Sequence, residues 1–446
     1  MTEKNYFSRK IDTELAAWAK AWNRKVLLLR GARQVGKTEA VRQLGKSFKN
    51  YVEVDLADRK DLHIYFERSL SPQKICEQLS YALQQPIVAG ETLLFLDEIQ
   101  ACIPGISKLR YFKEKYPELH VVAAGSLLEF ALEEIPSFGV GRITSMFMYP
   151  FSFEEFMLAL GNTMQVEAYR KACPAAPIDD VLNDLIINHL KTFLVVGGMP
   201  EAVSTYVRTN DLLQTQTVLS SLMVALKNDF AKYRKRVPLT RLNEVFESVA
   251  NQAEGKFVYE KAAVQASNAQ VKNVQVKHTL EMLVMAGLVI PVTHTAANGI
   301  PLGAEANHKF QRMFLLDTGI LQQVLGLDMS QIFATNDFKA ANRGAVAEIF
   351  VGLELLKNSS CYNPSSLYYW QRGKSKGDAQ VDFLLQKSEK IIPIEVKAGT
   401  QGAMQSLRLF MKEKKIQRGV RTSLENFGQL PDIDIYPMYA ISNLYG

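Results

Sequence analysis

The sequence contains few cysteines, and they show no pairing pattern, which excludes several classes of small protein. Its 446 residues include only Cys76, Cys102, Cys173 and Cys361, and no Cys-x-x-Cys pair occurs. Because the 6 histidines also lack metal-ligand spacing, a zinc finger, a zinc ribbon and a disulfide-dense secreted scaffold are excluded. The sequence has no run of about 18 apolar residues, and the polar start MTEKNYFSRK lacks the apolar core of a signal peptide. We therefore expect a cytoplasmic protein with reduced thiols and no membrane-spanning helix.

A large excess of charge of one sign is also lacking. The chain has 52 Lys and Arg against 46 Asp and Glu, which gives a formal net charge of +6. This balance permits a nucleic-acid partner without requiring one, because the local clustering of basic residues matters more than their sum. The hydrophobic fraction of 47% is that of a globular protein. At roughly 100–200 residues per domain, the length predicts two to four domains.

Four successive parts of the chain differ in pattern and together predict an α/β multidomain protein. Residues 1–150 alternate apolar runs with helical patterns, which predicts a P-loop core with a parallel sheet. Residues 151–240 have helical spacing and predict a helical subdomain. Residues 241–325 run helix, helix, helix and two strands, the order of a winged helix-turn-helix, with helices expected over Arg241–Glu254, Glu260–Ser267 and Val271–Ala286. Residues 336–446 alternate helices and strands and predict a C-terminal α/β domain.

A phosphate-binding loop is predicted directly after the apolar run Lys25–Arg30. The residues match the pattern G-x-x-x-x-G-K-[ST] and are Gly31, Ala32, Arg33, Gln34, Val35, Gly36, Lys37 and Thr38. The two glycines let successive backbone N–H groups converge on phosphates, and the following helix directs its positive end at them. Lys37 is placed to reach the β- and γ-phosphates, and the Thr38 hydroxyl is a ligand for Mg²⁺. The pattern predicts an ATP·Mg²⁺ site.

Two acidic residues end the apolar run Thr92–Glu98 in a Walker B arrangement. Asp97 is expected to hold the Mg²⁺ shell, and Glu98 to orient or deprotonate the attacking water. The next apolar run ends at Ser126, which fits either a γ-phosphate sensor or an ordinary helix N-cap. Arg142 follows a loop and is a candidate arginine finger, in cis or from a neighbouring subunit; a solvated surface arginine is the other interpretation.

These motifs carry a resemblance to a known family. The chain resembles a large prokaryotic family of AAA-type ATPases with a C-terminal domain of unknown function. The resemblance is carried by five segments, which occur in the order GARQVGKT, FLDEIQ, AAGSLLEF, GRITSMFMYPFSFEEF and GGMPEAV. The resemblance implies a P-loop ATPase core, a winged-helix segment and a nuclease-like end. One departure is Glu39, where the family usually has a small or hydroxyl residue; we expect its side chain to point away from phosphate.

The C-terminal part contains acidic residues in a second recognisable order. The order of four residues resembles that of the PD-(D/E)XK nucleases, especially the Holliday-junction-resolvase-like members with a restriction-endonuclease-like fold. These residues are Glu348, Asp382 and the pair Glu395 and Lys397. Residues two apart in a strand share a face, so Glu395 and Lys397 point to one side. The three carboxylates are expected to hold Mg²⁺ or Mn²⁺, and Lys397 to position the nucleophile or stabilise developing charge. Gln371 and the basic loop Arg372–Asp378 could contact a phosphate backbone or form a charged turn.

Two further basic groups are candidates for nucleic-acid contacts. The third helix of the expected winged helix carries polar residues suited to phosphates and base edges, namely Lys272, Asn273, Gln275, Lys277 and His278. A structural or lid role is the alternative for this segment. The cluster Lys232–Arg236 is either a solvated helix end or a phosphate contact, and its Arg234 is a candidate for acting in trans on a neighbour's ATP.

Three functions fit these motifs. The first is an ATP-switched, metal-dependent nuclease acting on nucleic acid, most simply DNA. The second is a nucleotide-gated regulatory or interaction protein with a catalytically inactive nuclease-like domain. The third is an ATPase that acts on proteins. A homo-oligomer or an unidentified protein partner is compatible with each, and a membrane partner is not expected.

Overall fold

The chain divides into two compact units, which are described separately. The computed structural model describes residues 6–126, 128–133, 141–233, 236–253, 255–262, 269–326, 343–363, 366–373, 379–399 and 404–445. The first unit comprises Met1–Tyr149, Met285–Gly287 and Ser360–Pro364, and the second comprises Pro150–Val284, Leu288–Ser359 and Ser365–Gly446. The boundary expected near residue 150 is where the main segments of the two units meet in the sequence. The expected helical subdomain, winged helix and C-terminal domain all fall mainly in the second unit, and the boundaries between them stay a prediction.

The first unit is built on a five-stranded sheet in which all strands run parallel. Its strands are β1 (Val26–Arg30), β2 (Asn50–Asp55), β3 (Thr92–Asp97), β4 (His120–Ala124) and β5 (Ile143–Phe147), in the order β2-β3-β4-β1-β5. The first four coincide, within one or two residues, with apolar runs of the sequence that predict strands, namely Lys25–Arg30, Tyr51–Leu56, Thr92–Glu98 and His120–Ser126. Because β3 and β4 are buried along their whole length, they need helices on both faces of the sheet.

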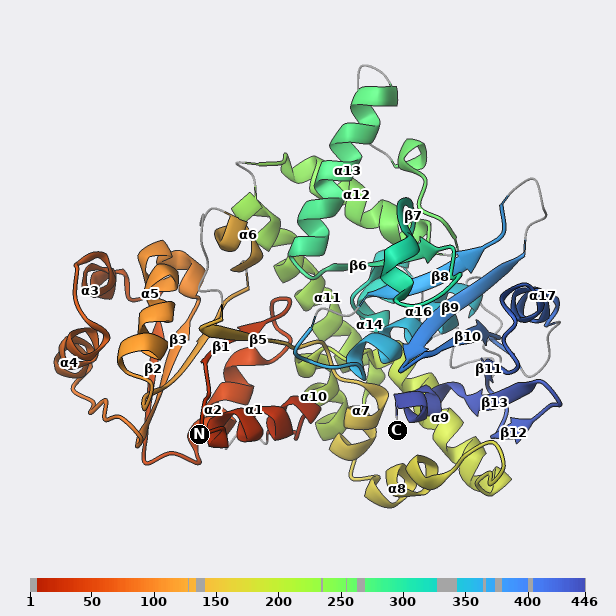
Figure 1. Cartoon of the computed structure of the whole chain (residues 1–446), viewed down its shortest axis with the longest axis horizontal. Helices are drawn as coiled ribbons and strands as arrows, with labels where there is room; N and C mark the ends of the chain where they lie inside the picture. Colours follow the sequence, from red (N-terminus) through yellow and green to blue (C-terminus); the bar gives the residue numbers. More distant parts are fainter. Residues whose placement is uncertain are drawn as a thin grey trace. The chain divides into compact units, whose positions relative to one another are not determined.

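Helices cover both faces of this sheet. One face packs against α3 (His63–Glu67), α4 (Pro72–Leu83) and α5 (Ile103–Lys115) through a core that contains Phe66, Ile75 and Phe112. The helices α1 (Lys10–Lys20) and α2 (Lys37–Gly45) lie beside the other face (Figure 1). The short α6 (Leu128–Glu133) follows β4. The parallel sheet of a P-loop core is therefore confirmed.

The second unit begins with a helical segment, as the sequence predicts. Its helices are α7 (Phe153–Ala159), α8 (Thr163–Lys171), α9 (Asp180–Val196), α10 (Pro200–Thr209), α11 (Leu212–Asp229), α12 (Leu239–Asn251), α13 (Ala269–Met285) and α14 (Thr318–Leu325). The helices expected over Arg241–Glu254 and Val271–Ala286 correspond to α12 and α13. The middle one does not begin as an α-helix, because Tyr259–Lys261 form a 3₁₀ turn, and residues 263–268 lie outside the described part of the chain. The winged helix-turn-helix stays a prediction.

A mixed eight-stranded sheet completes the second unit. Its strands are β6 (Val289–Thr295), β7 (Ala306–Leu315), β8 (Leu367–Gln371), β9 (Gln380–Lys387), β10 (Lys390–Val396), β11 (Gly419–Ser423), β12 (Gly428–Gln429) and β13 (Ile433–Pro437), in the order β12-β13-β11-β10-β9-β8-β6-β7. The strands expected as a wing, β6 and β7, pair antiparallel with each other, and β6 also pairs in parallel with β8. The hairpin therefore forms one end of the same sheet as the C-terminal strands.

Helices of the C-terminal part also pack against this sheet. α17 (Gln405–Lys414) buries Leu407 and Phe410 in a core with Trp370 and Val381. α16 (Arg343–Lys357) approaches so closely that a Cβ added at Gly352 would lie 2.9 Å from the Phe383 ring. Among the described residues, no helix combines the length and the hydropathy needed to cross a bilayer.

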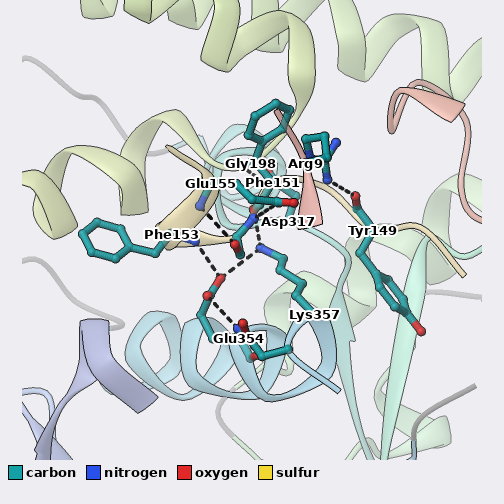
Figure 2. A network of polar contacts seen from close by, with 11 residues as sticks. Arg9, Tyr149, Phe151, Phe153, Glu155, Gly198, Asp317, Glu354 and Lys357 are labelled. Atoms are coloured by element: carbon teal, nitrogen blue, oxygen red, sulfur yellow. Dashed lines mark hydrogen bonds and ion pairs between the residues drawn. The ribbon is translucent and has the colours of Figure 1, made fainter. Parts of the chain in front are cut away.

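A buried polar network ties several helix ends of the second unit together (Figure 2). The Asp317 carboxylate, before α14, accepts hydrogen bonds from the N–H of Gly198 and of Ile320. On α16, the Lys357 amine donates to the Phe151 carbonyl at 2.8 Å, and Glu354 accepts from the Phe153 N–H at 3.2 Å. The network therefore joins the motif segments PFSFEEF and GGMP to α14 and α16, which gives those motifs a structural role in the second unit.

Candidate functional site

The phosphate-binding loop connects the end of β1 to the start of α2. Gly31 has φ of +143°, and a Cβ at this position would lie 2.2 Å from the Met148 carbonyl oxygen, so only glycine fits there. Gly36, at φ +99°, directly precedes the first residue of α2. The loop therefore ends at a helix N-terminus, where backbone N–H groups are free of intrahelical partners and attract anions.

Lys37 is held over the loop that precedes it. Its amine donates hydrogen bonds to the carbonyls of Gly31 and Ala32, both at 2.8 Å, and the residue is only 7% exposed. Burial lowers the pKa of Lys37 to about 8, against the opposite effect of the Glu98 and Asp97 carboxylates. A buried amine at a helix N-terminus suits a phosphate ligand, because phosphate supplies the compensating negative charge.

Thr38 and Asp97 meet at the carboxyl end of the sheet. The Thr38 hydroxyl donates to Asp97 Oδ2 at 2.7 Å, and the Glu98 N–H donates to Asp97 Oδ1 at 2.9 Å. Burial raises the pKa of the Asp97 carboxyl, while the Thr38 and Glu98 hydrogen bonds oppose that rise. The sequence-predicted pair from the P-loop and the Walker B strand is thus brought into direct contact.

Glu98 has an unusual backbone conformation just beyond β3. Its φ of 48° and ψ of 42° lie in the left-handed region, which non-glycine residues adopt at a cost of about 1–2 kcal/mol. Its Oε2 accepts hydrogen bonds from the Gln100 amide and, at 3.3 Å, from the Ser126 hydroxyl. Strained backbone of this kind is typical of functional sites. The structure therefore brings Glu98 and Ser126 together, and it adds Gln100, the last residue of the FLDEIQ motif, for which the sequence predicted no role.

The donor set of this site fits a magnesium ion bound with a nucleotide. A threonine hydroxyl and a buried carboxylate at 2.7 Å from each other are hard oxygen ligands of the kind that Mg²⁺ prefers. Because Mg²⁺ keeps most of its remaining ligands as water and phosphate oxygens, two protein ligands are sufficient. Bound Mg²⁺ would neutralise the charge of the phosphate oxygens.

Arg9 supports the loop from outside the motif. Its guanidinium donates to the Val35 carbonyl at 3.2 Å and to the Tyr149 carbonyl at 2.8 Å, and the residue is 6% exposed. It precedes α1, and its backbone N–H donates to Asp12 at 2.8 Å. No sequence signal indicated this residue, since a single arginine near the N-terminus has no pattern that separates it from a surface residue.

Arg142 is not among the residues that the structure brings to the loop. Its side chain is 51% exposed and forms an ion pair with Glu114 of α5 at 3.0 Å. The role of Arg142 as an arginine finger stays a prediction.

Three of the four predicted nuclease-like residues lie on adjacent strands or their ends. Asp382 on β9 and Glu395 on β10 are one residue beyond the register pair Ile394 and Phe383, so they lie opposite each other. The Lys397 amine donates to Glu395 Oε1 at 2.7 Å, and Asp382 Oδ2 accepts from the Val396 N–H at 2.8 Å. Burial and the nearby Asp382 carboxylate raise the pKa of Glu395 to about 7, against the effect of Lys397.

A buried arginine joins this group from the β6–β7 hairpin. Arg312 on β7 forms an ion pair with Glu348 of α16, and its Nη1 lies 4.0 Å from Asp382 Oδ1. Its side chain is 1% exposed. We refer to Glu348, Asp382 and Glu395 as the acidic cluster. Arg312 was not among the residues that the sequence predicted.

The acidic cluster does not fit a metal ion as it stands. Within the described ranges, no group of three or more His, Cys, Asp or Glu side chains is arranged to hold a metal ion. Each of the three carboxylates instead contacts a cation or donor of the chain: Arg312, the Val396 N–H or Lys397. The expected Mg²⁺ or Mn²⁺ at this cluster therefore has no support in the geometry.

The other basic candidates are only partly described. On α13, Lys272 donates to the Glu260 carbonyl at 2.9 Å, Asn273 donates to the Glu260 carboxylate at 2.8 Å, and Lys277 lies 3.8 Å from Glu281. Arg372 forms an ion pair with Glu413 at 2.6 Å. Residues 374–378 of the basic loop, and Arg234 with Lys235, lie outside the described residues.

Comparisons with known families support the assignment of the first unit. Residues 23–157 match the family model described as an AAA domain. Residues 187–331 and 343–441 match two families described only as domains of unknown function, DUF8612 and DUF4143. The AAA match, the parallel sheet and the P-loop agree that the chain contains an AAA-type P-loop ATPase domain. A search of curated proteins gives no match.

Three solved structures show a distant likeness to the chain. The Aeropyrum pernix ORC1 protein in complex with DNA is 14% identical, with a TM-score of 0.27, over 74% of this chain and 96% of that chain. The C. elegans PCH-2 structure is 13% identical, with a TM-score of 0.28, over 47% of this chain and 66% of that one. Unliganded Pif1 from Bacteroides sp. is 15% identical, with a TM-score of 0.22, over 37% of this chain and 49% of that chain. With such scores, none of the three supports an inference about function.

Proposed function

We propose that this protein binds ATP with Mg²⁺, hydrolyses the ATP, and uses this turnover to control its second unit. The observation that carries the proposal is the contact between Thr38 of the P-loop and Asp97 of the Walker B strand, at 2.7 Å. These two side chains supply the oxygens that we propose as Mg²⁺ ligands, and the charge of the buried Lys37 amine interacts with Asp97. The loop from Gly31 to Gly36 supplies the backbone N–H groups for the phosphates.

Glu98 is the residue that we assign to the attacking water. The Gln100 and Ser126 donors both bind its Oε2, and this fixes the carboxylate beside Asp97. The second oxygen is then the one that accepts a proton from water in line with the γ-phosphate. Ser126 holds Glu98 in this arrangement, and we keep γ-phosphate sensing as its further role. Arg142, or Arg234 of a neighbouring copy, would complete the charge stabilisation, which requires an assembled homo-oligomer if the arginine acts in trans.

Turnover at Glu98 tests this proposal directly. Glu98→Gln keeps the size of the side chain but removes its basicity, so ATP should still bind while phosphate release falls by about 10²–10⁴-fold. The matched control is Glu39→Gln, because Glu39 is exposed on α2 and pairs with Arg42 at 2.8 Å. The control should hydrolyse ATP at the wild-type rate. Wild-type turnover in Glu98→Gln, or no ATP binding by the wild-type chain, would contradict the proposal.

For the second unit we propose a nucleic-acid partner, with DNA as the first substrate to test. One candidate activity is strand cleavage by Glu348, Asp382, Glu395 and Lys397, which are all present. The other is a nucleotide-gated binding protein with an inactive nuclease-like domain. The ion pair of Arg312 with Glu348, and the approach of Arg312 to 4.0 Å from Asp382, favour the second candidate, because they place a positive charge beside the carboxylates that cleavage would need.

Cleavage assays separate these two candidates. Supercoiled and branched DNA would be incubated with the protein and Mg²⁺ or Mn²⁺, with and without ATP, beside Asp382→Ala and Lys37→Ala. The inactive-domain candidate predicts DNA binding without cleavage in every sample. Cleavage that Asp382→Ala abolishes, while ATP turnover persists, would instead establish the nuclease. An ATPase that acts on proteins would show neither binding nor cleavage.

A further inference from the structure

We infer that Arg312 closes the acidic cluster against divalent cations, so that the cluster is a buried ionic network and not a resident metal site. The inference concerns the second unit and does not depend on whether the first unit hydrolyses ATP. It bears on the choice between the two candidate activities of the second unit. It rests on the position of Arg312 and on the hydrogen bonds of the three carboxylates.

Arg312 supplies a permanent positive charge inside the cluster. Its side chain is 1% exposed, it forms an ion pair with Glu348, and its Nη1 lies 4.0 Å from Asp382 Oδ1. A guanidinium does not lose its proton in proteins, so this charge stays at any physiological pH. A charge that is removed from water in this way must be compensated by partners close by, and Glu348 and Asp382 are those partners.

A divalent ion would have to compete with donors already in contact with every carboxylate. Glu348 is in contact with Arg312, Asp382 Oδ2 accepts the Val396 N–H at 2.8 Å, and Glu395 Oε1 accepts the Lys397 amine at 2.7 Å. Among the described residues, Glu348 Oε2 and Glu395 Oε2 are the buried carboxylate oxygens of the acidic cluster without a hydrogen-bond partner, and Glu348 Oε2 already lies in the ion pair with Arg312. Two such oxygens, one of them paired with a guanidinium, are too few, since Mg²⁺ and Mn²⁺ sites use several oxygen ligands.

The charge balance leads to the same conclusion. Three carboxylates with Arg312 and Lys397 sum to one negative charge when all are ionised, and a divalent ion would turn this into one positive charge. That ion would also lie next to a guanidinium in a place shielded from water, where like charges repel strongly. Without Arg312, the same three carboxylates and Lys397 would be neutralised by one divalent ion. Arg312 therefore replaces part of the charge that a metal would supply.

Whether Arg312 excludes a metal ion from the acidic cluster depends on the position of the β6–β7 hairpin that carries it. Arg312 pairs with Val292 across β6 and β7, whereas Asp382 and Glu395 lie on β9 and β10. A shift of the hairpin relative to β9 would withdraw the guanidinium from the carboxylates. Metal-dependent chemistry at the acidic cluster would thus require the β6–β7 hairpin to move first.

Manganese binding to the full-length chain without nucleotide tests the inference. Mn²⁺ would be titrated and followed by electron paramagnetic resonance for the wild type, Arg312→Met, Arg312→Lys, Asp382→Asn and the double variant Arg312→Met with Asp382→Asn. We expect the wild type and Arg312→Lys to bind no Mn²⁺ at the cluster below about 1 mM, a range where weak protein sites already fill. Arg312→Met should bind Mn²⁺ at least tenfold more tightly, and Asp382→Asn should abolish the gain.

A second variant covers the case in which Arg312→Met does not fold. Arg312→Gln removes the positive charge, leaves all three carboxylates in place and keeps an amide that can donate to Glu348, and its near-ultraviolet circular dichroism shows whether the unit is native. If the folded variants bind Mn²⁺ no more tightly than the wild type, the inference is wrong. Wild-type Mn²⁺ binding that Asp382→Asn removes would overturn it as well. Neither outcome affects the ATPase proposal, because the Glu98→Gln experiment measures turnover separately.

Discussion

Arg9 lies outside every motif, but its guanidinium donates to the carbonyl of Val35 inside the phosphate-binding loop. The same group donates to the Tyr149 carbonyl, so one side chain links the loop to the segment after β5. Hydrogen bonds from a charged donor contribute about 1.5–3 kcal/mol each when buried. We therefore regard Arg9 as a positioning residue for the loop.

Substitution of Arg9 should weaken nucleotide binding more than it changes turnover. Arg9→Met removes both hydrogen bonds but keeps most of the side-chain volume, and we expect the Kd for ATP to rise about tenfold, equivalent to about 1.4 kcal/mol. Fluorescent nucleotide titration measures this change. Arg24→Met is the matched control, because Arg24 also donates to a backbone carbonyl, that of Pro117 at 3.2 Å, but not in the loop. Equal affinity losses in the two variants would contradict a specific role for Arg9.

His120 gives a pH-dependent prediction for the first unit. Burial and the nearby Arg24 lower the pKa of His120, partly offset by its hydrogen bond to the Ala19 carbonyl. As the pH falls through about 6.5, the unfolded chain takes up a proton at this histidine before the folded chain does, so stability decreases. His120→Gln should therefore flatten the fall of the melting temperature between about pH 7 and pH 5. His308→Gln, at an exposed position, should leave the profile unchanged, and a wild-type profile in His120→Gln would refute the prediction.

Single residues also show why parts of the candidate sites could be predicted from the sequence. Lys37 and Thr38 belong to a local pattern, and Asp97 follows an apolar strand, so spacing alone indicated the contact that the structure shows at 2.7 Å. Arg9 and Arg312 have no local pattern. Their burial depends on segments far away in the sequence, which only the folded chain brings together. The assigned chemical roles of all these residues stay predictions.

At the level of whole elements, apolar runs predicted the positions of strands well, whereas helical spacing predicted the ends of helices less well. The strands β1 to β4 lie within one or two residues of the predicted runs. β5 was not predicted, because Ile143–Phe147 has one fully buried residue and no continuous apolar run. The order β2-β3-β4-β1-β5 and the joining of β6 to β8 also could not be predicted, since strand pairing depends on contacts between distant segments. The helices α8 and α10 were not predicted as separate elements.

Gly198 lies where the GGMP segment meets the segment before α7, and it yields a prediction about how these elements pack. A Cβ at position 198 would lie 2.2 Å from the Phe151 carbonyl oxygen and 2.9 Å from its nitrogen, so the backbone would have to move. We expect Gly198→Ala to destabilise the second unit by about 3 kcal/mol. Chemical denaturation measures this loss. Gly344→Ala, near the start of α16 and with nothing within 4 Å, should cause no loss, and equal stability of the two variants would rule out the steric argument.

At the scale of the whole molecule, the modest net charge of +6 makes salt dependence the informative test of a nucleic-acid partner. If α13 contacts phosphates through Lys272 and Lys277, replacing both by alanine should reduce the slope of log Kd against log salt by about two. Fluorescence anisotropy with duplex DNA at several salt concentrations measures the slope. The variant with Lys20→Ala and Lys46→Ala removes the same charge from two other exposed lysines and should change the slope less. Identical slopes in both double variants would exclude α13 as the contact surface.

The parallel pairing of β6 with β8 also determines where the chain can be shortened. One family model ends at residue 331 and the next begins at residue 343, but the eight-stranded sheet continues across that gap. A fragment that ended between them would keep the hairpin and lose β8, so the backbone of β6 that pairs with Leu367 and Tyr369 would be exposed. Unpaired strand edges associate with other molecules. Such a fragment should therefore aggregate on expression, and Arg312 would be left without either acidic partner.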